Sequence, residues 1–262
     1  MSRRVPTPAY AAAGTGPGTL LFLHGIGGNR ASFAEQLPRL GKSWRALSWD
    51  MPGYGTSRAL EPPLTFEALA ESVIAVLDAE GAGSAVIVGH SLGGMIAQET
   101  VARFPQRVAG LVLFATTPAF GGKDDKFKNE FLAQRLAPLV QGKTMPEIAA
   151  ELVEGLFAPD PPEAARARAI AGMAAISPDA YRAALHCIVT FNRLEDLARI
   201  ACPTLVLAAE HDRLAPPKSM ERMARRIPGA AYRCLAGAGH LANIERPAAF
   251  DAALDEFLAT LA

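Results

Sequence analysis

Residues 85–97 read Ala-Val-Ile-Val-Gly-His-Ser-Leu-Gly-Gly-Met-Ile-Ala, and the pattern changes twice along them. Residues 85–88 form a short apolar run rich in β-branched side chains, which is typical of a buried strand. From Leu92 onward apolar residues recur at helical spacing, until Phe104 and Pro105 end the pattern. The segment therefore predicts a strand, a tight turn and a helix in direct succession.

Ser91 lies at the centre of this turn, in the pattern Gly-x-Ser-x-Gly. Between a strand and a helix this pattern is the signature of a nucleophile elbow, a turn that strains the serine backbone and exposes its hydroxyl. We expect glycine at positions 89 and 93 because side chains there would collide. The N-terminal end of the helix would stabilise negative charge that develops beside the serine. The alternative is a glycine-rich turn with an incidental serine.

Size and composition restrict the class of protein. The chain has 262 residues, 50% hydrophobic and 20% charged, which is enough for one sizeable core. The formal net charge of +0 and the short apolar runs indicate neither nucleic-acid binding nor membrane insertion. The basic start at residues 1–4 is followed by Val-Pro-Thr-Pro-Ala rather than by an apolar segment, so we expect no signal peptide and a cytoplasmic protein.

The chain contains three cysteines that are isolated from one another, Cys187, Cys202 and Cys234. Their odd number and their spacing argue against a disulfide framework or a zinc site. We therefore expect buried thiols and no metal.

Apolar strands alternate with helical segments up to residue 117 and again after residue 200. This order is typical of an α/β protein with a mainly parallel, twisted sheet flanked by helices. Between them no strand pattern is convincing, and four helical stretches follow one another. We therefore predict a core of residues 1–117 and 200–262, and a helical cap (lid) of residues 118–199 inserted before the last two strands.

A serine hydroxyl becomes a good nucleophile only when a base takes its proton, and that base needs an acid to orient it. In folds with a nucleophile elbow the chain order is serine, acid, histidine. Asp212 and His240 both follow strand-like runs after Ser91, and His240 lies in the glycine-rich sequence Gly-Ala-Gly-His. We predict the triad Ser91, Asp212 and His240. Glu210 is the competing acid, and a structural loop histidine is the competing interpretation of His240.

Three further polar residues, His24, His90 and Asp50, lie at or near the carboxyl ends of predicted strands, where parallel sheets bind ligands. They have simpler structural interpretations. We expect both histidines to form hydrogen bonds with loop backbone and Asp50 to order its own turn.

Taken together, these motifs resemble the α/β-hydrolase superfamily over essentially the whole chain. The residues that carry the resemblance are His24-Gly25, residues 50–57, residues 89–94, residues 212–216 and Gly239-His240. The resemblance implies the α/β-hydrolase fold, an oxyanion hole formed by the backbone N–H groups of Ile26 and Leu92, and a cap that shapes the pocket.

Within the superfamily, the chain most resembles the bacterial 3-oxoadipate enol-lactonase and carboxylesterase-like group. Residues 89–98 and 237–240 are alike there, whereas residues 51–55 read Met-Pro-Gly-Tyr-Gly where those lactonases often carry Arg-Gly-His-Gly. Dehalogenases and epoxide hydrolases need a carboxylate at the elbow, so Ser91 disfavours both. Meta-cleavage C–C hydrolases usually carry tryptophan after the catalytic histidine, where this chain has Leu241.

The predicted activity is hydrolysis of a carboxylic ester or lactone through an acyl-enzyme, without a metal or organic cofactor. The alternatives are a C–C bond hydrolase of meta-cleavage products and, in another class, a ligand sensor on a hydrolase fold. The predicted partner is a small-molecule substrate, bound by a monomer or homodimer.

Residues of the cap and of the loops near the triad are candidates for binding the substrate. The candidate substrate contacts are Gly25, Phe120, His186, Leu214 and Leu241. An acidic substrate would need an arginine inside the cap, and the sequence offers three equal candidates, Arg135, Arg182 and Arg193.

Overall fold

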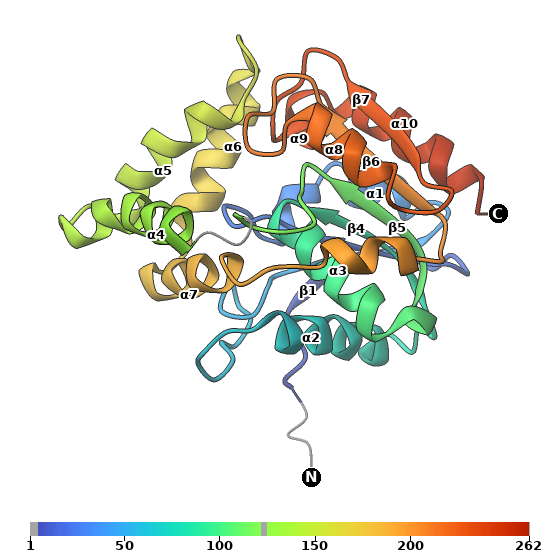
Figure 1. The fold of residues 1–262 in the computed structure, drawn as a ribbon. Coiled ribbons are helices and arrows are strands. Elements are labelled where there is room, and N and C mark those ends of the chain that lie inside the picture. Colours follow the sequence, from blue (N-terminus) through green and yellow to red (C-terminus); the bar gives the residue numbers. More distant parts are fainter. Residues whose placement is uncertain (1–4, 122–124, 262) are drawn as a thin grey trace.

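A seven-stranded sheet with helices on both faces organises the chain (Figure 1). The structure, a computed structural model, describes residues 5–121 and 125–261. The basic start at residues 1–4, residues 122–124 of the predicted cap and residue 262 of the predicted core lie outside the described residues. The strand order is β1-β3-β2-β4-β5-β6-β7, and neighbouring strands are parallel except β1 and β3. The predicted mainly parallel α/β architecture is therefore confirmed.

The strands are short and follow the predicted apolar runs closely. They are β1 (Tyr10–Ala13), β2 (Thr19–Leu23), β3 (Arg45–Trp49), β4 (Ala85–His90), β5 (Val108–Phe114), β6 (Thr204–Ala209) and β7 (Ala231–Leu235). The helices of the sheet layers are α1 (Gln36–Leu40), α2 (Phe66–Ala79), α3 (Leu92–Arg103), α8 (Pro217–Ala224), α9 (Ala242–Glu245) and α10 (Pro247–Ala259). Short 3-10 helices are η1 (Arg30–Phe33), η2 (Pro105–Arg107), η3 (Glu154–Leu156) and η4 (Leu194–Arg199).

The core has two parts because successive side chains of a strand point to opposite faces of the sheet. In β2, for example, Leu21 and Leu23 pack in the cluster that contains α2 and α3. The alternate residues Leu20 and Phe22 pack with η1, α1 and α10. The central strands are buried on both faces, which explains why they read as continuous apolar runs rather than as alternating ones.

Between β5 and β6 the chain leaves the sheet for four helices, α4 (Asp125–Val140), α5 (Met145–Val153), α6 (Glu163–Ala174) and α7 (Pro178–Ile188). Figure 1 shows these helices gathered on one side of the sheet. The segments that enter and leave them, residues 118–120 and 191–193, run antiparallel. The amide of Phe120 donates to the Phe191 carbonyl at 2.9 Å, and that of Arg193 donates to the Pro118 carbonyl at 2.8 Å. We call this pair of segments the neck.

The described residues contain no helix that is both long and apolar enough to cross a membrane. The three cysteines are free thiols. Cys187 is buried as predicted, but Cys202 is half-buried and Cys234 is exposed. The prediction of a buried thiol is wrong for Cys234 because β7 is the last strand of the sheet and most of its residues are exposed or half-buried.

Candidate active site

Ser91 occupies the sharp turn between β4 and α3 with a positive φ of 52° and a ψ of −116°. A non-glycine residue in such a conformation carries strain of about 1–3 kcal/mol. Hydrogen bonds hold it in place, since the Ser91 amide donates to the Phe114 carbonyl at 2.9 Å and the Thr116 hydroxyl donates to the Ser91 carbonyl at 2.7 Å. The predicted strained elbow is therefore present.

The glycines that flank the serine leave room for this turn. A Cβ at Gly89 would lie 2.5 Å from the Gly93 carbonyl oxygen, as the elbow pattern predicts. A Cβ at Gly93 would lie 2.1 Å from the carbonyl oxygen of Leu23, at the end of the neighbouring strand β2. The elbow therefore needs glycine both for its own turn and for its close approach to β2.

His240 and Asp212 form a hydrogen-bonded pair that is almost completely buried. Nδ1 of His240 lies 2.8 Å from Oδ2 of Asp212, and the other oxygen of Asp212 accepts hydrogen bonds from the amides of Leu214 and Ala215. Burial by itself would raise the pKa of Asp212, but the charge of His240 and these hydrogen bonds outweigh it and hold the pKa below its ordinary value. A carboxylate accepts the Nδ1 proton, so Nε2 of His240 keeps the lone pair that a base needs.

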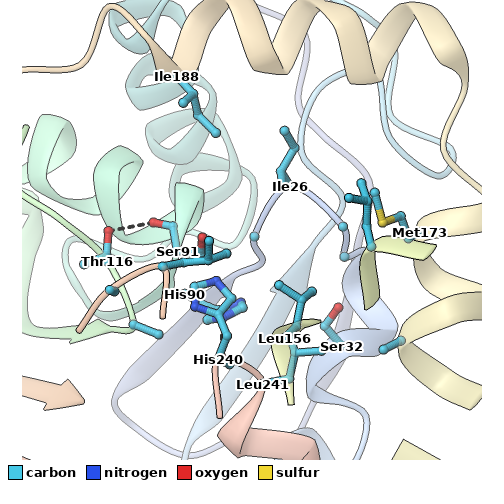
Figure 2. Close-up of a pocket in the computed structure, with 18 of the residues that line it drawn as sticks. Ile26, Ser32, His90, Ser91, Thr116, Leu156, Met173, Ile188, His240 and Leu241 are labelled. Atoms are coloured by element: carbon cyan, nitrogen blue, oxygen red, sulfur yellow. Dashed lines mark hydrogen bonds between the residues drawn. The ribbon is translucent and has the colours of Figure 1, made fainter. Parts of the chain in front are cut away.

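Ser91 and His240 line the same cavity, and Figure 2 shows both beside His90. Among the described residues, no hydrogen bond joins the Ser91 hydroxyl to His240. In enzymes without substrate such bonds are often long and tighten only when the substrate is bound. Glu210, the competing acid, instead accepts the amide proton of Gly237 at 2.8 Å on an exposed loop.

His90 and His24 form hydrogen bonds with loop backbone. Nε2 of His90 donates to the His240 carbonyl at 2.9 Å. The amide of Met51 donates to Nε2 of His24 at 3.0 Å, so Nδ1 carries the proton and donates to the Gly25 carbonyl at 2.8 Å. Burial lowers the pKa of His90 to about 3 and that of His24 to about 4, so both rings are neutral at pH 7.

Asp50 orders its own turn, because its carboxylate accepts the amide proton of Thr56 at 3.3 Å. The same carboxylate also accepts the amide proton of Arg30 at 2.8 Å. Asp50 thereby joins its turn to the glycine-rich loop that follows β2.

The two backbone amides predicted for an oxyanion hole have no hydrogen-bond partner among the described residues. Ile26 is the second residue of a turn closed by the Gly28 amide, which donates to the Gly25 carbonyl at 3.0 Å. Leu92 is the first residue of α3, where an amide has no acceptor within the helix. Both N–H groups are therefore available beside Ser91, and their role remains a prediction.

A cavity of about 580 Å³ lies above the elbow, between the loops at the carboxyl ends of the strands and helices α4–α7. Its lining is largely apolar, and Figure 2 shows Ile26, Leu156, Met173 and Ile188 around it. The lining includes four of the five predicted substrate contacts, Gly25, Phe120, Leu214 and Leu241.

The remaining predicted contact, His186, does not line the cavity. It is exposed on α7, whereas Tyr181, Leu185 and Ile188 of the same helix face the cavity. Successive helical residues are about 100° apart, so the residue after Leu185 points away from this face. The prediction of His186 as a pocket group is therefore wrong.

The buried carboxylate of Glu245 is a site residue that the sequence analysis missed. Oε2 accepts the Gly239 amide proton at 2.7 Å, and Oε1 accepts that of Ala158 at 2.9 Å. The amide of His240 donates to the Leu156 carbonyl at 2.7 Å. These bonds fix the histidine loop to residues 156–158, which follow α5. No local signal pointed to Glu245, because a glutamate two residues before a proline is usually exposed.

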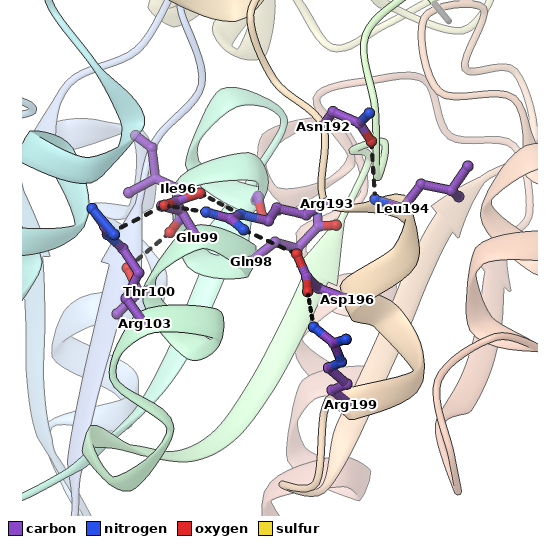
Figure 3. A network of polar contacts seen from close by, with 11 residues as sticks. Ile96, Gln98, Glu99, Thr100, Arg103, Asn192, Arg193, Leu194, Asp196 and Arg199 are labelled. Carbon is purple, nitrogen blue, oxygen red and sulfur yellow. Dashed lines mark hydrogen bonds and ion pairs between the residues drawn. The ribbon is translucent and has the colours of Figure 1, made fainter.

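A second buried carboxylate, Glu99 of α3, pairs with Arg193 of the neck (Figure 3). Arg193 also lies 3.0 Å from Asp196. Arg193 was one of the three candidate arginines for binding an acidic substrate. Its guanidinium is instead paired with the carboxylates of Glu99 and Asp196. Arg182 does not line the cavity, whereas Arg135 does.

The sequence model of the alpha/beta hydrolase fold family matches residues 18–247 of this chain. The chain belongs to the α/β-hydrolase fold family. It is 31% identical to a provisionally named carbamate hydrolase of Caulobacter sp. strain K31, over 92% of this chain and 90% of the relative. The predicted fold and superfamily are thus confirmed.

Solved structures of α/β hydrolases superimpose on this chain over almost its whole length. An esterase from Thermogutta terrifontis, with malate bound, matches with a TM-score of 0.88 and 26% identity, covering 97% of this chain and 93% of the other. The enol-lactonase from Burkholderia xenovorans LB400 matches with a TM-score of 0.87 and 25% identity, covering 96% of each chain. These relatives support a hydrolase and leave its substrate open.

Proposed function

We propose that this α/β hydrolase cleaves a carboxylic ester or lactone through the triad Ser91, His240 and Asp212. The Ser91 hydroxyl attacks the carbonyl carbon while Nε2 of His240 takes its proton. Asp212 fixes the tautomer of the imidazole and stabilises its charged form. The amides of Ile26 and Leu92 hold the oxyanion, and each such donor lowers the barrier by about 3 kcal/mol.

The tetrahedral intermediate then collapses and the C–O bond to the leaving group breaks. His240 returns the proton to the departing oxygen, which leaves as an alcohol or, from a lactone, stays attached as the new hydroxyl of the acyl group. Water, deprotonated by His240, attacks the carbonyl carbon of the acyl-enzyme. The bond to Ser91 Oγ then breaks, His240 returns its proton to Ser91, and the acid is released. Apart from the attacking water, every proposed step uses side chains and amides of this chain. Helices α4–α7 serve as the predicted cap over the acyl group.

The observation that carries this proposal is the Asp212–His240 hydrogen bond at the edge of a cavity that Ser91 also lines. A ligand sensor needs neither a strained serine nor an oriented histidine. The esterase and the enol-lactonase among the similar structures support the same reaction class.

Hydrolysis of p-nitrophenyl acetate and p-nitrophenyl octanoate by the native protein and by Ser91→Ala tests the proposal. We expect the mutant to lose at least about 1,000-fold in kcat. Full activity in Ser91→Ala would overturn serine catalysis. A coloured meta-cleavage product, tested in parallel, identifies C–C hydrolysis if it is turned over and the esters are not.

A carbamate is the second candidate substrate class, because the 31% identical relative carries that name. Attack by Ser91 on a carbamate carbonyl uses the same oxyanion donors, with nitrogen or oxygen as the leaving atom. A preference for p-nitrophenyl carbamate over p-nitrophenyl acetate, lost in Ser91→Ala, would favour this class over carboxylic esters.

A further inference from the structure

The permanently charged side chains in the described lining of the cavity are all positive. The described lining includes two arginines, Arg135 and Arg168, and no aspartate or glutamate. Arg168 forms an ion pair with Glu35, which compensates its charge. Arg135 has no carboxylate within ion-pair distance among the described residues. One uncompensated positive charge therefore borders an otherwise largely apolar cavity.

Arg135 is held in place by an aromatic side chain of its own helix. Its guanidinium carbon lies 5.6 Å from the centre of the Phe131 ring, one helical turn earlier in α4. The Phe131 ring in turn packs edge-on against Phe120, with 4.7 Å between the ring centres. A guanidinium over a ring face is attracted by the π electrons, which favours this orientation of the Arg135 side chain.

Tyr181 on the facing helix α7 adds a second donor near Arg135. Its side chain is 1% exposed and lines the cavity, and its hydroxyl has no hydrogen-bond partner among the described residues. Arg135 and Tyr181 line the same cavity. Burial raises the pKa of Tyr181, with the positive charge of Arg135 opposing the shift, so the phenol stays protonated at neutral pH. A tyrosine hydroxyl that lines an apolar cavity can donate a hydrogen bond to a ligand bound there.

We propose that Arg135 and Tyr181 form a carboxylate subsite, so that the substrate is an ester or lactone bearing a second, free carboxylate at its far end. This inference rests on the proposed hydrolysis at Ser91. The apolar lining between the triad and α4 and α7, which includes Leu156, Met173 and Ile188, suits the methylene chain that joins the two ends of such a substrate.

The test compares monomethyl esters of straight-chain dicarboxylic acids, from succinate to suberate, with methyl alkanoates of matched length. We expect the native enzyme to prefer the acid ester at one or two chain lengths. Charge-assisted hydrogen bonds are strong, so Arg135→Gln should reduce this preference by about 10- to 100-fold. Tyr181→Phe, which removes only the hydroxyl, should reduce it by about 3- to 10-fold.

Arg182→Gln is the matched control, because it removes one positive charge from α7 outside the cavity lining. We expect it to leave the preference unchanged. Equal rates for acid and neutral esters in the native enzyme would overturn the subsite while leaving ester hydrolysis intact. A preference that survives in Arg135→Gln, or that falls equally in Arg182→Gln, would also overturn it.

Calorimetric binding of adipate to Ser91→Ala separates the subsite from the proposed function. If no ester is hydrolysed by the native enzyme but adipate binds Ser91→Ala and fails to bind Ser91→Ala/Arg135→Gln, ester hydrolysis is wrong and the subsite stands. If esters are hydrolysed and no dicarboxylate from succinate to suberate binds Ser91→Ala, the subsite is wrong and ester hydrolysis stands.

Discussion

Arg193 holds both carboxylate oxygens of Glu99 at 2.6 Å, and so ties the neck of the helical segment to the helix that begins at the nucleophile elbow (Figure 3). The Glu99 side chain is only 3% exposed, whereas that of Arg193 is 26% exposed. Arg103 lies 3.4 Å from the same carboxylate. Glu99 therefore depends on these two arginines for its charge partners inside the protein.

Arg193→Gln leaves Glu99 buried with Arg103 as its only remaining cationic partner among the residues that the structure describes. We expect the free energy of unfolding to fall by about 2–4 kcal/mol, because the buried carboxylate loses its two short hydrogen bonds to Arg193 and keeps one longer ion pair. Thermal unfolding should show this as a decrease in Tm of about 5–10 °C. Arg199→Gln is the control, since Arg199 is 82% exposed in its pair with Asp196 and should change Tm little. Equal effects of the two substitutions would contradict the special role of the neck pair.

Asp212→Asn keeps the shape of the acid and removes its charge. The amide can donate to Nδ1 of His240, which places the imidazole proton on Nε2 and removes the base. By analogy with the same change in a serine protease, kcat should fall by about 10,000-fold. Glu210→Gln, on the same loop, should retain nearly full activity. The opposite ranking in steady-state ester hydrolysis would make Glu210 the acid of the triad.

The Glu245 carboxylate accepts hydrogen bonds from the amides of Gly239 and Ala158. In Glu245→Gln, the side-chain NH₂ would face one of these two N–H donors. One buried N–H then lacks its acceptor, and we expect unfolding to become easier by about 1–3 kcal/mol. The His240 loop also loosens against residues 156–158, so kcat should fall more than KM rises. Aspartate at position 245 keeps the charge but is shorter, so partial rescue by it is not expected. A variant with native kcat and native stability would show that Glu245 does not position His240.

Gly93→Ala tests the close approach of the elbow to β2. The new methyl group would lie 2.1 Å from the Leu23 carbonyl oxygen and 2.8 Å from that of His24, both backbone atoms. We expect a loss of about 3 kcal/mol or more in folding free energy, measured by urea denaturation. Gly155→Ala serves as the control, because nothing lies within 4 Å of its Cβ, and it should stabilise the protein by up to about 1 kcal/mol.

Acid should destabilise the protein below neutral pH partly through His24. Burial lowers its pKa from 6.5 to about 4, so between these values the unfolded chain binds a proton that the folded chain does not. The contribution of His24 to the free energy of unfolding is therefore fully present above pH 6.5. It falls by on the order of 3 kcal/mol as the pH decreases toward 4. Urea denaturation at several pH values measures the slope. In His24→Gln the slope should correspond to about one fewer proton taken up on unfolding. An unchanged slope would contradict the role of His24 in acid destabilisation.

Local sequence was sufficient for the strands and for the elbow, and it led to the prediction of a triad. β4, Ser91 and α3 were predictable because a buried strand, a strained turn and an amphipathic helix each leave a signal within a few residues. The end of the alternation of strands and helices was visible for the same reason, and helices α4–α7 lie in that stretch. The cap of residues 118–199 stays a prediction.

Which side chains face the cavity was decided only by the tertiary structure. Helical spacing shows that a face exists but not which partner it meets, so His186 was wrongly placed in the pocket, and Arg135 could not be separated from Arg193. Glu99 and Glu245 could not be found, because each has a decisive partner far away in the chain, Arg193 at 94 residues and Ala158 at 87 residues. The sequence by itself determined the fold, and it led to the prediction of the catalytic residues. Long-range packing decided which polar groups were buried, paired and aimed into the cavity, because burial depends on neighbours distant in the chain.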